Sequence, residues 1–267
     1  MDLRLNGKTA VVFGGSGAIG GAAARAFVRE GAKVLLIARG EARLKALAER
    51  LQAQGGDAQH FTADVLDAEN TTLLMQDLAK RFGEFSVVVN ATSFMHDQGS
   101  NIDALDVDAF MQPLTTFLPA LFNATKAVLP HMAKGDQSTI FTLSTPAGRT
   151  ATAGHLGYSA TCAGIEAFTR VLAAELGPRN IRVVCVAPHA IADAPQNGSY
   201  TRELFAAKAS AIGMSVEDWL AAAAGGTMLG ELPTLEEVAD ALVFLASDRA
   251  KSVTSSYFNI SAGSVSD

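Results

Sequence analysis

The glycine-rich stretch that begins at residue 14 is the part of the chain whose residue types most directly imply a chemistry. An apolar run, Thr9–Phe13, leads into Gly-Gly-Ser-Gly-Ala-Ile-Gly, and an alanine-rich helical pattern follows. Glycine permits a positive φ and lets backbone N–H groups approach a phosphate, while the positive N-terminus of the next helix attracts an anion. The stretch therefore predicts a dinucleotide pyrophosphate site, with an ordinary strand-to-helix loop as the alternative. The candidate contacts in it are Gly14, Ser16, Gly17, Ala18, Ile19 and Gly20.

The residue after the second apolar run bears on which dinucleotide is bound. NAD sites usually place a carboxylate there to bind the ribose hydroxyls, but Lys33–Ala38 is followed by Arg39. A guanidinium pairs well with a 2′-phosphate, so the sequence favours NADP(H), with NAD still possible. Ser16 or Arg43 could assist. The alternative is that Arg39 is a solvated residue at the start of a helix.

Apolar runs alternate with helical patterns along most of the chain, as in right-handed βαβ units. Strands are expected at Thr9–Phe13, Lys33–Ala38, Ala58–Thr62, Ser86–Asn90, Thr139–Leu143, Arg182–Ala187 and Tyr257–Ile260. Helices are expected at Ala18–Arg29, Arg43–Gln54, Ala68–Phe82, Val107–Ala133, Leu156–Leu176 and Leu235–Ala246. The pattern predicts an α/β protein: one Rossmann-type domain over residues 1–267, with a doubly wound, seven-stranded parallel sheet and helices on both faces.

Ligands of such a sheet bind beyond the carboxyl ends of its strands. The residues expected there are Asp64, Val65, Asn90, Ala91, Ser144, Thr145, Pro188 and Ile191. Segment 191–232 separates the sixth strand from the last helix, and we expect it to form a substrate-side lid with short helices at Tyr200–Ser210 and Val216–Ala224. Its apolar residues suggest an apolar or mixed substrate, although they could equally pack the lid or form a subunit contact.

Composition narrows the class of protein. The chain has 267 residues, of which 49% are hydrophobic, and a formal net charge of −6, which argues against nucleic acid or an anionic membrane as partner. No secretory pattern and no apolar run of roughly 20 residues is present, so a soluble, cytoplasmic protein is expected. Cys162 and Cys185 lack metal-ligand spacing, which favours buried thiols over a disulfide or zinc site. We expect no metal.

Further motifs make the chain resemble the short-chain dehydrogenase/reductase family over essentially its whole length. Gly14-x-x-x-Ala18-Ile19-Gly20 stands where the family has three glycines. The other matching motifs are Asp64-Val65, Asn90-Ala91, Thr125 to Met132, Tyr158-Ser159-Ala160, Ile181-Arg182-Val183 before Val186-Ala187-Pro188, and Glu236 to Ala239 before Phe244 to Ser247. The resemblance implies NAD(P)-dependent oxidation or reduction of a small-molecule alcohol or carbonyl by a homo-dimer or homo-tetramer.

The resemblance also assigns catalytic positions. It implies Tyr158 as general acid/base, also in contact with the cofactor, and Thr145 with Ser144 beside it as the hydroxyl that binds the reacting oxygen. The family's lysine position holds Cys162 and its asparagine position holds Phe117. The nucleotide end of the site therefore looks intact and the reacting end altered. Two hypotheses follow: an NADP(H)-linked oxidoreductase with a changed proton relay, or an inactive dinucleotide-binding protein that acts as a sensor or oligomer partner.

A few other residues leave alternatives open. His155 and His189 could border the site, and one of them acting as a replacement acid/base would allow a different reaction such as hydration or isomerisation, whereas His96 is placed only as following the fourth strand. Arg149 is either a substitute cation for the missing lysine or a solvated loop residue. Cys162 is a reactive thiol only if its surroundings lower its pKa; otherwise it is an inert buried cysteine.

Overall fold

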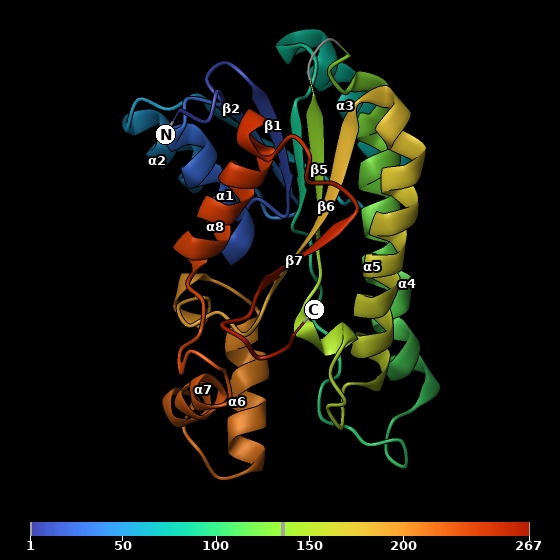
Figure 1. Ribbon diagram of the computed structural model, residues 1–267, viewed down its shortest axis with the longest axis vertical. Helices are drawn as coiled ribbons and strands as arrows, with labels where there is room; N and C mark the ends of the chain where they lie inside the picture. Colours follow the sequence, from blue (N-terminus) through green and yellow to red (C-terminus); the bar gives the residue numbers. More distant parts are fainter. Residues whose placement is uncertain (1, 135–136, 267) are drawn as a thin grey trace.

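Runs of valine, leucine and isoleucine form the centre of the sheet because its strands are covered on both faces. In the computed structural model, which describes residues 2–134 and 137–266, seven parallel strands lie in the order β3-β2-β1-β4-β5-β6-β7 (Figure 1). Their bounds are β1 Thr9–Phe13, β2 Lys33–Ala38, β3 Ala58–Thr62, β4 Val87–Asn90, β5 Ser138–Leu143, β6 Ile181–Pro188 and β7 Ser256–Ile260. The predicted fold class is confirmed.

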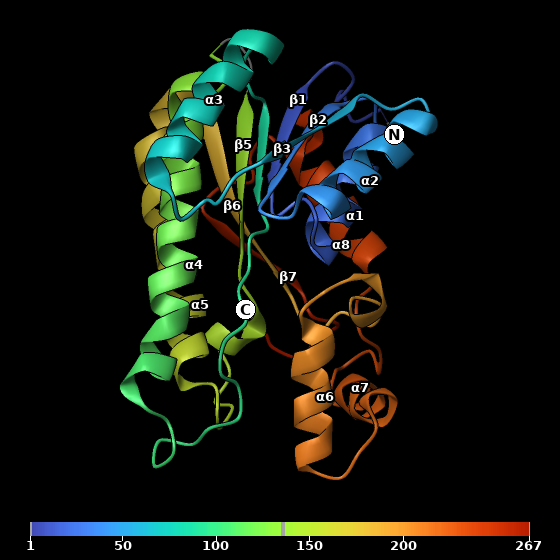
Figure 2. The ribbon, with the colours of Figure 1, turned by 180° about the vertical axis from the view of Figure 1, so that it is seen from behind.

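Helices cover both faces of the sheet. Helices α1 (Ala18–Arg29), α2 (Glu41–Ala53) and α8 (Leu235–Ala246) lie on one face, and α3 (Ala68–Phe82), α4 (Val107–Val128) and α5 (Leu156–Leu176) lie on the other (Figures 1 and 2). Successive strand residues alternate between the two layers: Val12 belongs to the first core, whereas Val11 belongs to the second. The two cores fix the carboxyl edge of the sheet, where the site residues lie.

The observed elements differ from the predicted ones mainly at their ends. The fourth helix was expected to reach Ala133, but α4 ends at Val128 and a 3₁₀ turn, Leu129–His131, follows. Pro130 lacks the N–H that would continue the α-helical hydrogen bonds. Helix α2 begins at Glu41, two residues earlier than its hydrophobic pattern suggests.

Segment 191–232 lies beyond the carboxyl ends of the strands (Figures 1 and 2). It carries helices α6 (Thr201–Ala211) and α7 (Val216–Gly225), close to their expected positions. Asp193 Oδ1 accepts a hydrogen bond from Leu235 N at 2.9 Å, which ties the start of the segment to α8. The rings of Phe205 and Trp219, 4.5 Å apart, join the two helices to each other.

None of the helices in the described part of the chain is both long and apolar enough to cross a bilayer.

Candidate active site

One large cleft of about 1500 Å³ opens at the carboxyl edge of the sheet. The turn between β1 and α1 and the residues after β2 and β3 line one end of it, and residues from α5 and segment 191–232 line the other. A single cavity therefore contains the predicted nucleotide end and the predicted reacting end.

The turn at the nucleotide end depends on glycine for its packing. Gly14 has φ +73°, and a Cβ there would lie 2.3 Å from the carbonyl oxygen of Ala91. A Cβ on Gly20 would lie 2.3 Å from the carbonyl oxygen of Gly14. The first contact sets the turn against the residue that follows β4 and the second sets α1 against the turn, so a larger residue does not fit at either position.

The start of α1 provides the donors that a pyrophosphate needs. Its N-cap is Gly17, with no side-chain cap and no acidic residue in the first turn. Its first N–H groups and the positive end of its dipole are therefore available to an anion, and the turn fits a dinucleotide. Ala18, at the family's second glycine position, is buried and adds one methyl group to this cradle.

Two arginines make the same end cationic. The Arg39 guanidinium lies over the Phe94 ring, 5.5 Å from its centroid, and forms no ion pair within the described residues. Arg43 Nη2 donates to the backbone oxygens of Ser16 at 3.1 Å and Gly198 at 2.6 Å. Arg43 thus joins the glycine turn to segment 191–232, while Arg39 remains free to bind a phosphate.

Most of the predicted cofactor-binding residues line the cleft, namely Gly14, Ser16, Gly17, Ala18, Ile19, Arg39, Asp64, Val65, Ala91, Tyr158, Pro188 and Ile191. The other two, Gly20 and Asn90, lie behind this lining. Gly20 packs on the turn, and Asn90 Nδ2 donates to Phe141 O at 3.2 Å, which links β4 to β5. Gly20 and Asn90 therefore support the backbone that borders the cleft.

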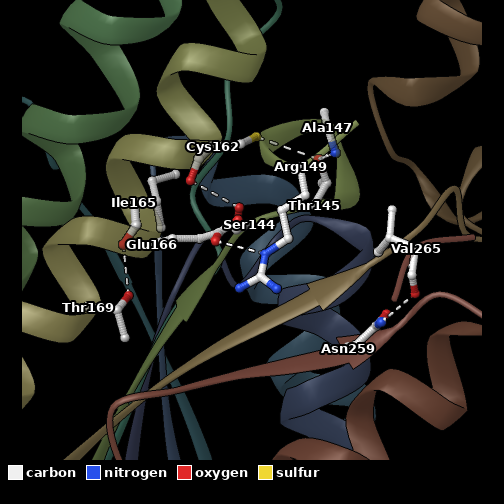
Figure 3. A network of polar contacts seen from close by, with 10 residues as sticks. All are labelled: Ser144, Thr145, Ala147, Arg149, Cys162, Ile165, Glu166, Thr169, Asn259 and Val265. Atoms are coloured by element: carbon white, nitrogen blue, oxygen red, sulfur yellow. Dashed lines mark hydrogen bonds and ion pairs between the residues drawn. The ribbon is translucent and has the colours of Figure 1, made fainter. Parts of the chain in front are cut away.

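At the reacting end, α5 brings the tyrosine and cysteine positions together. Tyr158 and Cys162 are four residues apart and so share one face of the helix. Thr145 Oγ1 lies 3.5 Å from Cys162 Sγ, and Ser144 Oγ donates to the backbone oxygen of Cys162 at 3.2 Å (Figure 3). The three predicted catalytic residues, Tyr158, Thr145 and Ser144, therefore gather around a thiol.

The electrostatics of this cluster keep the phenol protonated. Burial raises the pKa of Tyr158 well above its usual value, the neighbouring Cys162 and Tyr200 raise it further, and the Thr145 hydroxyl opposes the shift. Burial also raises the pKa of the Cys162 thiol, so it is uncharged and unreactive at neutral pH. Because no cation among the described residues acts on Tyr158 to favour the phenolate, Tyr158 can donate a proton but is a poor base.

Aromatic rings enclose the phenol. The His96 ring stacks on Tyr158 with centroids 4.1 Å apart, and Phe117 meets Tyr158 edge-on at 6.2 Å. Phe117 also meets Phe94 edge-on at 5.4 Å. Phe117, at the position where the resemblance predicts an asparagine, is therefore a buried apolar ring against the phenol, and it has no group that could relay a proton.

A lysine that the sequence analysis missed lies farther along the cleft. Lys208, from α6, donates from Nζ to Gln98 Oε1 and, at 2.8 Å, to His155 Nε2. Burial lowers its pKa to about 8. No spacing rule could have linked it to partners 110 and 53 residues away.

Both expectations for Arg149 were wrong. Arg149 Nε donates to Glu166 Oε2 at 3.0 Å (Figure 3). Its guanidinium lies 3.5 Å from the centroid of the Tyr257 ring. Its side chain is only 30% exposed, so it is not a solvated loop residue, and it does not line the cleft. Among the described residues, no histidines, cysteines and carboxylates cluster as a metal site.

Known proteins of one family are similar to this chain over most of its length. The family model for short chain dehydrogenases matches residues 8–203. The 3-oxoacyl-(acyl-carrier-protein) reductase of Pseudomonas aeruginosa is 32% identical over 98% of both chains, and the 2,5-dichloro-2,5-cyclohexadiene-1,4-diol dehydrogenase of Sphingobium indicum is 28% identical over 95% of this chain and 94% of its own.

Among solved structures, the L-sorbose reductase of Gluconobacter frateurii superposes with a TM-score of 0.88 at 24% identity, with both chains covered completely. At that identity the likeness shows a shared fold. The family model and the full-length relatives go further, and they establish that this chain belongs to the short-chain dehydrogenase/reductase family.

Proposed function

We propose that this protein is an NADP(H)-dependent reductase that converts the carbonyl group of a small molecule to an alcohol, with Tyr158 as proton donor. The observation that carries the proposal is a protonated phenol beside the Thr145 hydroxyl, in the same cleft as an open glycine turn. The Pseudomonas relative, also named as a reductase, supports the same direction of reaction.

When bound, a reduced nicotinamide supplies hydride to the carbonyl carbon. The hydroxyls of Thr145 and Tyr158 hold the carbonyl oxygen, and Tyr158 transfers its proton to the oxyanion as it forms. Ser144 fixes this group by its hydrogen bond to the α5 backbone, and Phe117 keeps water out. Alcohol oxidation needs the phenolate, whose formation the raised pKa opposes.

Preference for NADP(H) rests on Arg39. It follows β2, where an NAD-binding protein would place a carboxylate, and it lines the cleft without an ion-pair partner among the described residues. The structural neighbour from Gluconobacter frateurii was solved with NADPH and L-sorbose. Binding of NADPH tighter than NADH is the expected result.

A specific observation favours a second candidate, a dinucleotide-binding protein without hydride transfer. Cys162 removes the cation that the family uses beside its tyrosine. Measuring NADPH binding by fluorescence together with NADPH consumption over a panel of ketones and oxo esters separates the two candidates. Binding with turnover supports the reductase, binding alone supports the second candidate, and absence of binding removes both.

We further infer that segment 191–232 closes as a lid and that the protein forms homo-dimers or homo-tetramers. Exposed apolar side chains on the helices of one layer support the second point, including Phe122 of α4 and Val171 of α5. Light scattering on the purified protein tests it, and a monomer at micromolar concentration contradicts it. A cytoplasmic location suits the free thiols of Cys162 and Cys185, which stay reduced there.

A further inference from the structure

The end of the cleft beyond Tyr158 contains an ammonium group with no counter-charge. Lys208 is half-buried, lines the cleft and lies over the Trp219 ring, 5.8 Å from its centroid. Among the described residues no carboxylate comes within ion-pair distance of it. A partly desolvated cation without an anionic partner costs free energy, which the binding of an anion would recover.

The donor and acceptor roles of the side chains around Lys208 can be assigned from their hydrogen-bond partners. His96 Nδ1 lies 2.8 Å from Phe94 O and therefore carries the proton, so His96 Nε2 accepts from Gln98 Nε2 at 2.7 Å. The Gln98 Oε1 atom is then left to accept from Lys208. The amide orientation and the tautomer are thereby fixed by their partners.

The second partner of the lysine follows the same logic. His155 Nδ1 lies 3.1 Å from Ala153 O and donates to it, so His155 Nε2 accepts from Lys208 Nζ at 2.8 Å. Two of the three ammonium hydrogens thus go to neutral acceptors. The third is available to a ligand in the cleft.

The other titratable groups at this end do not neutralise the lysine. Burial first, and then the Lys208 charge, lowers the pKa values of His96, His155 and His189, so all three rings are neutral at pH 7. The acidic side chain that acts electrostatically on His96 and His155 is Asp97, whose carboxylate accepts from Ser100 Oγ at 2.7 Å and Ser100 N at 3.3 Å. Asp97 is thus engaged by Ser100, and within the described residues the Lys208 ammonium forms no ion pair.

We propose that Lys208, held in place by Gln98 and His155, binds a carboxylate of the substrate, which makes the substrate an oxo acid. The proposal rests on the proposed reductase function and names its substrate class. His155 precedes Tyr158 by three residues, or about one helical turn, so a ligand can reach the phenol with its carbonyl and the ammonium with its carboxylate. One ammonium among neutral imidazoles matches the single charge of a carboxylate better than the double charge of a phosphate.

Trp219 provides a direct assay, because it is the only tryptophan in the chain and lies beside Lys208. The probes are 3-oxobutanoate, 4-oxopentanoate and 5-oxohexanoate, each compared with its uncharged primary amide, with and without NADP⁺. Trp219 fluorescence reports binding without any hydride transfer. At pH 7 we expect at least one acid of the series to bind about tenfold or more tighter than its amide.

The preference for an oxo acid over its amide should depend on Lys208 and on its charge. Lys208→Met should abolish it, Lys208→Arg should retain part of it, and Lys80→Met, a matched change on the exposed side of α3, should leave it unchanged. In the unmodified protein it should fall as the pH rises through about 8, where the ammonium loses its proton.

Three results would overturn the proposal: equal binding of acids and amides, an unchanged preference in Lys208→Met, or no binding of any acid in the series. Displacement of the acids by inorganic phosphate at lower concentration than by acetate would overturn the carboxylate assignment. An acid preference without NADPH consumption would leave this site standing and remove the reductase function, so the two failures are distinguishable.

Discussion

The two ends of the cleft are built from different parts of the chain, and they differ in whether backbone or side chains form them. The nucleotide end is formed by backbone: the tight contacts of Gly14 and Gly20 and the open N-terminus of α1. The reacting end is formed by side chains, and in the proposed function Cys162 and Phe117 stand there in place of a cation and a polar relay. Binding and chemistry can therefore change independently in this protein.

The difference also has an electrostatic side. Arg39 and Arg43 make the nucleotide end positive, whereas the surroundings of Tyr158 are aromatic rings, a hydroxyl and an uncharged thiol. A phenol in such surroundings remains an acid. The comparison is consistent with the proposed reductase, for which we expect ordinary cofactor binding and slow alcohol oxidation.

Removal of the phenol should give the largest effect. In Tyr158→Phe the proton donor is lost, so kcat for a neutral ketone should fall by about 10²–10⁴-fold while NADPH affinity stays nearly constant. Steady-state kinetics and fluorescence titration measure the two quantities. Tyr257→Phe, at a ring that packs on Arg149, is the matched control and should retain activity. Full activity in Tyr158→Phe would mean that another group, such as His155, supplies the proton.

Disturbance of the backbone end should affect folding and binding together. Gly14→Ala places a Cβ 2.3 Å from Ala91 O at φ +73°, and we expect a loss of about 2–4 kcal/mol in the free energy of unfolding with loss of NADPH binding. Gly55→Ala, at φ +84° with nothing within 4 Å, carries only the left-handed strain of about 1–2 kcal/mol. Urea unfolding compares the two variants, and equal losses would show that the close contact at Gly14 relaxes easily.

Much of this architecture can be predicted from the sequence because it depends on local patterns. The bounds of α1, α3, α5 and α8 coincide with the apolar periodicity, and the i,i+4 spacing correctly places Tyr158 beside Cys162 on α5. Packing between distant segments leaves no such pattern. The pairing of Arg149 with Glu166 and the contact of Lys208 with Gln98 and His155 depend on how separate elements meet, so sequence reasoning misread the first and missed the second.

The cofactor preference tests the nucleotide end at a single side chain. In Arg39→Ala we expect NADPH to bind about tenfold weaker and NADH to bind almost unchanged, because only NADPH carries the 2′-phosphate. Calorimetric titration of both cofactors gives the ratio. Arg81→Ala, which removes an exposed ion pair with Asp77 on α3, is the control. A parallel loss of affinity for both cofactors would show that Arg39 binds another part of the nucleotide.

The smallest effect expected in the unmodified protein is the pH dependence of reduction. Since the pKa of Tyr158 is raised well above its usual value, the acid form persists and kcat for a neutral ketone should change less than about twofold between pH 6.5 and 9. Cys162→Lys places an ammonium beside the phenol, which favours the phenolate. In that variant reduction should decline as the pH rises, and alcohol oxidation should become measurable.

Cys162→Met, which adds length without charge, controls for the loss of packing around a cysteine that is 1% exposed. Phe117→Asn combined with Cys162→Lys should strengthen oxidation further, because it restores a polar side chain where an apolar ring now meets Tyr158. If the reduction rate of the unmodified protein already falls steeply as the pH rises from 6.5 to 9, then some cation lowers the pKa of the Tyr158 phenol after all. In that case another cation takes the place of the family's lysine beside Tyr158, and alcohol oxidation by the unmodified protein should become measurable over the same pH range.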